Sequence, residues 1–270
     1  MMAFDCMPHI IRLLRTLIVS LIRLAHCPYI ADVEAVFVVQ EPLFAAYVQL
    51  PFFNGGDLRQ WVADSQPPIC RRVELLTQLA HALQYMHERG IAHGDVKLEN
   101  VLVAIEGERA TAHLADFESA RVGRTTASGG RTATRGQSTT GYGHLFTDRY
   151  VAPEILQASR EGRERDAKPT AMGDMFSYGV CCLFACCLPP TEAEQEVAFA
   201  RFEADGRQLT DWSNALAALA NAHLPSLLVQ LLAPAATHEE ALDRRLDAKQ
   251  VLQWPLMASE FWPLMATNGH

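Results

Sequence analysis

The chain has 270 residues, of which 49% are hydrophobic and 20% are charged, and its formal net charge is −8. This is the composition of a globular protein with enough apolar residues for one large domain or two closely packed lobes. We expect no nucleic-acid partner and no anionic-membrane surface, because phosphates are held chiefly by Lys and Arg and this chain is acidic overall. Lysine occurs only at positions 97, 168 and 249. Nothing in the composition specifies an oligomeric state.

Seven cysteines are present, and four of them lie in one apolar run, at positions 181, 182, 186 and 187. Neither a His nor a third Cys pair lies beside this run. We therefore expect these cysteines to pack inside a buried helix, since free Cys behaves like a small hydrophobe. The odd count, without a clear secretion signal, favours a reducing compartment, and we expect a cytoplasmic protein.

Residues 10–25 place polar side chains at positions 12, 15, 16, 20 and 23, which is the spacing of an amphipathic helix. The arginines interrupt the apolar run well before about 18 residues, so we expect no membrane span. A signal peptide or an Arg-containing presequence is the alternative, because residues 6–31 contain no acidic side chain. Two strands joined by a turn are expected next, at residues 26–37 and 45–53.

Residues 54–57, N-G-G-D, predict a turn into a helix that Asp57 caps. Residues 71–89 then carry apolar side chains at helical spacing, and Gly90 ends this second helix. A β-hairpin is expected over residues 101–115, with its turn at E-G-E.

The most informative stretch is residues 91–103, I-A-H-G-D-V-K-L-E-N-V-L-V, in which Asp95 is followed by Lys97 and Asn100. A second acid, Asp116, lies beyond the predicted hairpin, in L-A-D-F-E-S-A. Phosphoryl transfer uses such a set: an acid that takes a proton from the incoming hydroxyl, a cation beside the phosphoryl group, and an amide and a second acid that hold Mg²⁺. Because the hairpin joins the two halves, we expect Asn100 and Asp116 to lie near each other.

Residues 121–146 change to Gly, Ser, Thr and Arg without an apolar period, which is typical of a flexible loop. Two further stretches follow: residues 150–154 read Y-V-A-P-E, and residues 174–179 read D-M-F-S-Y-G. The remaining chain predicts helices around residues 174–188, 191–205, 211–220 and 224–233.

Taken in order, these stretches resemble the protein kinase superfamily, whose catalytic loop H-R-D-x-K-x-x-N is followed by D-F-G and A-P-E. In this chain Gly94 replaces the Arg, and Glu118 replaces the last Gly of D-F-G. The resemblance implies an α+β, two-lobed kinase-like fold. It would comprise a truncated small β lobe at 1–50, with helix C and two strands, a mainly helical large lobe at 51–262, and a tail at 263–270.

The resemblance also implies a role for each motif residue. Asp95 would be the catalytic base, Lys97 the partner of the migrating phosphoryl group, and Asn100 and Asp116 the ligands of Mg²⁺. Thr147 would contact the catalytic residues and, with Lys97, would favour a protein substrate that accepts phosphate on Ser or Thr.

The resemblance assigns two further sets of residues. The residues facing ATP would be Leu50, Pro51, Phe53, Asp57 and Leu102. A plain strand–turn–helix connection is the alternative for this segment. The residues with structural roles would be His93, Phe117, Glu154, Asp174 and Arg245, among which Glu154 and Arg245 would form a buried ion pair.

Three features of the kinase pattern are missing. The sequence has no Gly before Gly55 and no Lys before Lys97, and Leu17 and Ile18 lie near the position of the helix C glutamate. Either the sequence is an incomplete version of a longer chain, or the protein lacks the usual phosphate clamps. With Gly94 in place of the Arg that receives an activating phosphate, we expect no regulation through that contact at residues 121–146.

Three functions are therefore compared. The first is a Ser/Thr protein kinase that uses ATP and Mg²⁺. The second is a pseudokinase, a binding or scaffold module, which the missing lysine and acid favour. The third is a small-molecule phosphotransferase, whose H-G-D-x-x-x-x-N and D-x-E patterns fit Gly94 and Glu118, whereas residues 150–154 and 174–179 favour a protein kinase.

Overall fold

The computed structural model describes residues 24, 26–39, 45–122, 149–163, 165–187, 192–204 and 223–257. Its strands are β1 (Ala35–Val39), β2 (Ala45–Gln49), β3 (Ile91–Ala92), β4 (Val101–Glu106), β5 (Arg109–Leu114) and β6 (Arg121–Val122). Its helices are α2 (Leu58–Ser65), α3 (Ile69–Glu88), the 3-10 turn η1 (Leu98–Asn100), α4 (Pro153–Arg160), α5 (Ala171–Cys187), α6 (Glu192–Ala204), α8 (His223–Leu231), α9 (His238–Arg244) and α10 (Ala248–Leu252).

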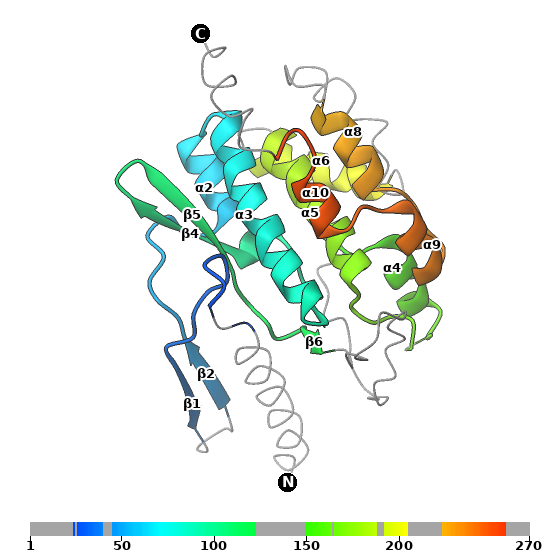
Figure 1. Ribbon diagram of the computed structural model, residues 1–270, viewed down its shortest axis with the longest axis horizontal. Coiled ribbons are helices and arrows are strands. Elements are labelled where there is room, and N and C mark those ends of the chain that lie inside the picture. Colours follow the sequence, from blue (N-terminus) through cyan, green and yellow to red (C-terminus); the bar gives the residue numbers. More distant parts are fainter. Residues whose placement is uncertain are drawn as a thin grey trace.

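The described chain is a mixed α/β structure, mostly helical, with three small two-stranded antiparallel sheets (Figure 1). It is consistent with a protein kinase fold. Several expectations lie outside the described residues: the helix at 10–25 apart from Leu24, the loop at 123–146, Thr147, the helix at 211–220 and the tail at 263–270.

The first expected strand, at residues 26–37, is wrong in its start, because β1 begins only at Ala35. His26 has a positive φ of 79°. Pro28 has no N–H to give to a strand ladder. The main chain around Ile30 pairs instead with the end of β5: Ala31 N donates to Leu114 O at 2.9 Å. This segment therefore fastens the chain ahead of β1 to the strand that leads to Asp116.

The predicted turn at residues 54–57 and its helix cap are confirmed. The Asp57 carboxylate accepts a hydrogen bond from Gln60 N at 2.9 Å and so caps α2. The turn pairs with β4, since Gly55 N donates to Val103 O at 2.9 Å. A Cβ at Gly55 would lie 2.8 Å from that same oxygen, so only glycine allows this close approach.

The long helix α3 lies between the β4–β5 hairpin and α5, and Figure 1 shows α3 and α5 side by side in the centre of the molecule. Its apolar side chains pack into the core, and buried Gln78 accepts a hydrogen bond from Ala112 N of β5 at 2.7 Å. The predicted end is also confirmed, because Gly90 follows α3 with a φ of 68°. The helix thus delivers the chain directly to residues 91–100.

Helix α5 is buried along nearly its whole length, which is the pattern of a central helix that other helices surround. Cys181, Cys182 and Cys186 are buried within it, and burial raises the pKa of Cys182 to about 12. These thiols are therefore protonated packing residues, as predicted. Helices α6 and α8 match the predicted helices at 191–205 and 224–233. Within the described chain, no helix combines the length and apolar composition that a membrane crossing requires.

Candidate active site

The predicted catalytic loop connects β3 to β4 and carries its chemistry in residues 95–100. Lys97 Nζ lies 2.6 Å from Asp95 Oδ2, and the Lys97 and Asp95 side chains are 20% and 10% exposed. Buried Val96 and Leu98 alternate with these polar residues and hold the loop against the core. The sequence spacing D-x-K therefore presents a carboxylate and an ammonium group together at a partly open surface.

Asn100 completes this cluster from the last position of η1. Its Nδ2 donates to Asp95 O at 2.8 Å and to Asp95 Oδ2 at 3.0 Å. These bonds use the amide nitrogen as a donor and leave Oδ1 as the side-chain atom that could bind a cation. The main chain of Asn100 also meets the second motif, because Ala115 N donates to Asn100 O at 2.9 Å.

Asp116 follows that contact directly and is exposed. Its φ of 62° is in the left-handed region, which is uncommon for a residue other than glycine, and its Oδ1 accepts from Glu118 N at 3.3 Å. Among the described residues, no three His, Cys, Asp or Glu side chains form a group that could hold a metal ion. The oxygen donors of Asn100 and Asp116 still fit Mg²⁺, which usually binds one or two carboxylates together with water and substrate phosphates.

His93 lies fully buried behind these residues. Its Nε2 donates to Ala115 O at 2.9 Å, and its Nδ1 accepts from Asp95 N at 3.3 Å. Burial lowers the pKa of His93 below its ordinary value, so that the ring is neutral and can accept at one nitrogen while it donates at the other. The ring of Phe117 packs on it at 5.2 Å between centroids. His93 thus joins the two motifs from inside the core.

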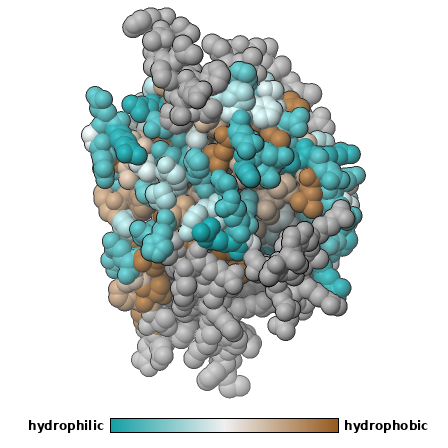
Figure 2. Space-filling model, in the orientation of Figure 1, coloured by the Kyte–Doolittle hydropathy of each residue, from teal (hydrophilic) through white to brown (hydrophobic). Residues whose placement is uncertain are grey.

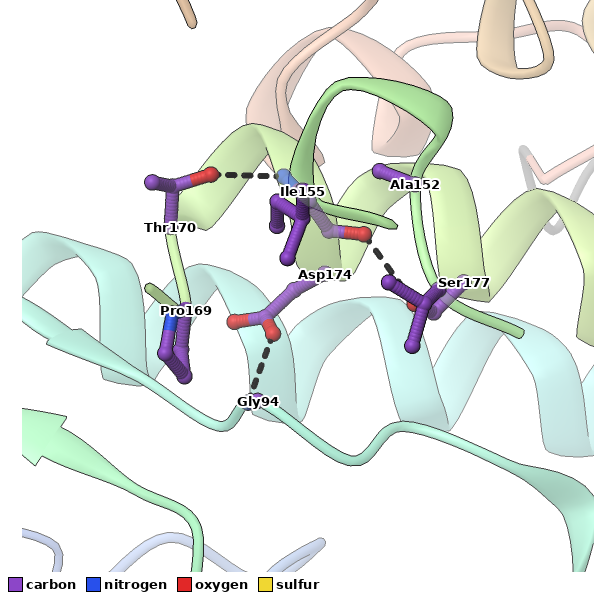
Figure 3. Close-up of a pocket in the computed structure, with 9 residues that line it drawn as sticks. Gly94, Ala152, Ile155, Pro169, Thr170, Asp174 and Ser177 are labelled. Carbon is purple, nitrogen blue, oxygen red and sulfur yellow. Dashed lines mark hydrogen bonds between the residues drawn. The ribbon is translucent and has the colours of Figure 1, made fainter. Parts of the chain in front are cut away.

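Asp174, near the start of α5, binds the main chain of the catalytic loop from the core side. It is 2% exposed, and its carboxylate accepts from His93 N and Gly94 N, each at 2.8 Å, and contacts His87 Nε2 at 2.9 Å. Figure 3 shows Asp174 pointing at Gly94 in a small pocket between α4 and α5. The backbone of the catalytic loop is therefore positioned by a buried carboxylate, both oxygens of which are hydrogen-bonded.

Gly94 itself has a φ of 85°, and a Cβ there would lie 2.6 Å from Pro169 Cγ and 2.9 Å from Ser119 O. Pro169 thus occupies the space beside the position where the kinase pattern has Arg, as seen in Figure 3. The glycine is required by this packing.

Four of the predicted nucleotide-facing residues, Leu50, Pro51, Phe53 and Asp57, lie in the segment that leads into α2, and the fifth, Leu102, lies in β4. Asp57 and Leu102 are opposite each other in an isolated antiparallel bridge. Leu50, Pro51 and Phe53 are partly exposed in the segment that leads into it, and the Phe53 ring packs against His113 at 5.0 Å. The structure therefore places Phe53 and Asp57 beside the β4–β5 hairpin that contains Leu102, while Asp57 Oδ1 is already used by the helix cap.

The predicted ion pair between Glu154 and Arg245 is present. Arg245 Nη2 donates to Glu154 Oε2 at 2.7 Å, Nη1 reaches Glu154 Oε1 at 2.5 Å, and the two side chains are 0% and 1% exposed. Arg245 also donates to Ala233 O at 3.0 Å. This bidentate pair joins α4 to the end of α9.

Sequence reasoning missed a second polar cluster, formed by Arg59, Glu99, Arg149, Tyr150 and Glu196. Arg59 contacts Glu99 and Glu196, which are 40 and 137 positions away in the sequence. No motif or periodicity relates residues at such separations, so the sequence contained no local signal for this cluster.

Comparison with known proteins agrees with this geometry. The sequence model of the protein kinase domain family matches residues 18–257, and the chain therefore belongs to this family. It is 31% identical over 176 residues to human MAP kinase-activated protein kinase 2, covering 62% of this chain and 38% of that protein. It is 33% identical over 170 residues to mouse protein kinase C eta type, covering 63% of this chain and 21% of that protein.

A more distant relative is the serine/threonine-protein kinase KSP1 of Saccharomyces cerevisiae, 27% identical over 140 residues. That alignment covers 51% of this chain and 12% of KSP1. The chain therefore spans less than half the length of each of these relatives, all of which are distant.

Proposed function

We propose that this chain transfers the terminal phosphoryl group of ATP to Ser or Thr hydroxyls of protein substrates. Asp95 accepts the proton of the attacking hydroxyl, and Lys97 lies beside the group that is transferred. Asn100 and Asp116 would hold Mg²⁺, which would neutralise the phosphate charge when bound. The Ser/Thr preference is supported by Lys97 and by the similarity to distant relatives such as KSP1, which is a serine/threonine-protein kinase.

The observation that carries this proposal is the bonding of Asp95. Its Oδ2 meets Lys97 Nζ at 2.6 Å and Asn100 Nδ2 at 3.0 Å, which fixes the carboxylate at the surface of the loop. A carboxylate oriented by two such contacts can accept the proton of an attacking hydroxyl. Because phosphoryl transfer depends mainly on positioning and electrostatics, a carboxylate held in this way suits the reaction.

The proposal is tested by following phosphate transfer from radiolabelled Mg-ATP to a generic basic protein and to the chain itself. Asp95→Asn keeps the shape of the side chain but removes the proton acceptor, and we expect the rate to fall about 100-fold or more. Asp64→Asn, an exposed acid at the end of α2, is the matched control and should transfer phosphate at the wild-type rate. Equal rates in Asp95→Asn and wild type, or none in either, would reject the proposal.

A second candidate is a pseudokinase that binds partners without efficient transfer. The sequence feature that favours it is the lack of any Gly before Gly55 and of any Lys before Lys97. Loss of one buried charged contact, worth about 2–5 kcal/mol, would slow transfer by roughly thirtyfold to several thousandfold.

Thermal unfolding with and without Mg-ATP separates these two functions. A ligand present at about 100 times its dissociation constant stabilises a fold by about 2.7 kcal/mol. Stabilisation by Mg-ATP but not by Mg²⁺ alone would show nucleotide binding. Unchanged unfolding at millimolar nucleotide would favour the binding module.

A further inference from the structure

A closed ring of polar contacts joins α6, α2, the catalytic loop and the segment before α4. We define this clasp as Arg59, Glu99, Arg149, Tyr150 and Glu196. Arg59 Nη1 contacts Glu99 Oε1 at 3.1 Å, and Arg59 Nη2 contacts Glu196 Oε1 at 3.2 Å. Arg149 binds both oxygens of Glu196, at 3.0 and 2.7 Å. Tyr150 donates its hydroxyl to Glu99 at 3.2 Å, and the Arg149–Tyr150 peptide bond closes the ring.

The clasp has the features that make a surface ion-pair network effective. Isolated exposed pairs contribute little, whereas bidentate Arg–carboxylate pairs and connected networks contribute more. The guanidinium groups of Arg59 and Arg149 also lie 5.0 and 4.5 Å from the centroid of the same buried ring, Phe199 of α6. Hydrogen bonds from Arg149 hold the pKa of Glu196 below its ordinary value, which agrees with a carboxylate that is ionised while it binds both arginines.

Two members of the clasp connect it to the rest of the fold: Glu99 to the catalytic loop and Tyr150 to the core. Glu99 is the immediate neighbour of Asn100 within η1. Tyr150 is 2% exposed, its ring packs on Phe184 of α5 at 5.8 Å, and its carbonyl accepts from Ser177 Oγ at 2.8 Å. Glu196 therefore connects α6 to η1 through Arg59, and to the segment before α4 through Arg149.

We propose that Glu196 is a positioning residue that, through Arg59 and Arg149, holds the catalytic loop and the segment before α4 in one register. It acts through other residues and touches no reacting atom. The kinetic part of this inference rests on the proposed phosphoryl transfer. The structural part, the ordering of residues 97–101 and 149–152 by Glu196, is independent of it.

The test combines amide hydrogen exchange with kinetics on the full chain. Glu196→Gln keeps the size of the side chain and removes its charge, and we expect exchange to rise about three- to tenfold in peptides covering residues 97–101 and 149–152. Peptides from the β4–β5 hairpin should not change. Glu239→Gln, an exposed acid of α9, is the matched control. Arg149→Lys, which keeps the charge but loses the two-pronged contact, should give an intermediate increase.

Salt adds a second readout, because the charged side chains of the clasp are partly exposed and screening weakens their attraction. At about 1 M NaCl, exchange of these two peptides in the wild type should approach that of Glu196→Gln in low salt. If phosphate transfer is measurable, Glu196→Gln should lower kcat about three- to tenfold and change the KM for Mg-ATP less, since no clasp residue belongs to the segment at 50–57 or to Leu102.

The outcomes separate the two proposals. Faster exchange at both peptides in a chain that transfers no phosphate would keep the clasp and reject the proposed function. Exchange in Glu196→Gln equal to wild type would overturn the clasp, whether or not the chain transfers phosphate. Faster exchange over the whole chain would also overturn it, because it would show a loss of global stability.

Discussion

Two regions of the molecule differ in which side chains they bury. The core behind the catalytic loop buries charged side chains, whereas the β1–β2 hairpin leaves large apolar side chains exposed. In the core, Glu154, Asp174 and Arg245 are 2–4% exposed as whole residues, yet the charged group of each is bonded. In the hairpin, Phe37 and Tyr47 are 53% and 59% exposed. Apolar side chains at the lower left of Figure 2 lie over this hairpin, on a face that is otherwise mostly hydrophilic.

This contrast indicates which contacts fix the geometry of the candidate site. A buried charge is tolerated only where its partners are fixed, so such groups define one arrangement of the backbone around them. A two-stranded hairpin with exposed apolar residues buries little area and contributes little to stability. The catalytic loop is therefore held by contacts on its α5 side. Substitutions among those buried residues should lower the free energy of unfolding far more than substitutions in β1 or β2.

The largest expected effect comes from breaking the buried ion pair. Glu154→Gln leaves the Arg245 guanidinium buried without its counter-charge, and we expect the free energy of unfolding to fall by about 3–5 kcal/mol. Urea unfolding followed by circular dichroism measures it. The matched control, Glu239→Gln on the exposed side of α9, should leave the unfolding midpoint unchanged. A loss below about 1 kcal/mol for Glu154→Gln would contradict the contrast between the two regions.

The next effect compares two glycines that both have positive φ. Gly94→Ala places a Cβ against Pro169 and Ser119, whereas Gly107→Ala, in the β4–β5 turn, meets nothing within 4 Å. Both changes carry the backbone cost of about 1–2 kcal/mol, and Gly94→Ala should add about 1–3 kcal/mol of overpacking. The difference between the two variants in the free energy of unfolding, measured in urea, gives the contribution of the steric clash at Gly94. Equal losses would show that Pro169 moves aside freely.

A smaller effect concerns pH and the buried His93. Its folded-state pKa lies below the ordinary 6.5, so below about pH 6.5 the unfolded chain takes up a proton that the folded chain does not. Stability is therefore fully present above that pH and falls as the pH is lowered, by up to about 1.4 kcal/mol per pH unit. Burial also lowers the pKa of His81 and His113, which contribute to the same slope.

The contribution of His93 to the pH dependence of stability is obtained by comparing the wild type with a variant that lacks this residue. Urea unfolding between pH 7 and pH 5 should show a shallower slope for His93→Gln than for the wild type, even though the variant is less stable at every pH. The exposed His26, changed to Asn, should keep the wild-type slope. An unchanged slope in His93→Gln would show that the ring titrates normally in the folded state.

The smallest effect is expected in the hairpin. Phe37 lies opposite Tyr47 in the β1–β2 register, and Phe37→Ala should lower the free energy of unfolding by less than about 1 kcal/mol. The same change at Phe184, which is fully buried against Phe199, should cost about 3–5 kcal/mol. Comparable losses at the two positions would mean that the hairpin is a stabilising part of the fold.

Much of the candidate site could be predicted because its signals are local. Asp57 as a helix cap, Gly90 after α3 and the hairpin between Asn100 and Asp116 each depend on residues a few positions apart. The Glu154–Arg245 pair was predicted across a long separation, but only because the family resemblance related the two segments. The start of β1 was predicted wrongly, since residues 26–34 look apolar enough for a strand, while the main chain of Tyr29 and Ala31 bonds to Leu114 at the end of β5.

By itself, the sequence determined the family, the order of the motifs and the residues proposed for chemistry, because these depend on short spacings along the chain. Only the tertiary structure decided that Asp174 supports Gly94, that Pro169 fills the space beside it, and that Glu196 binds both Arg59 and Arg149. The physical reason is that such contacts depend on how helices pack across the core. Packing brings together groups whose separation in the sequence carries no information about their distance in space.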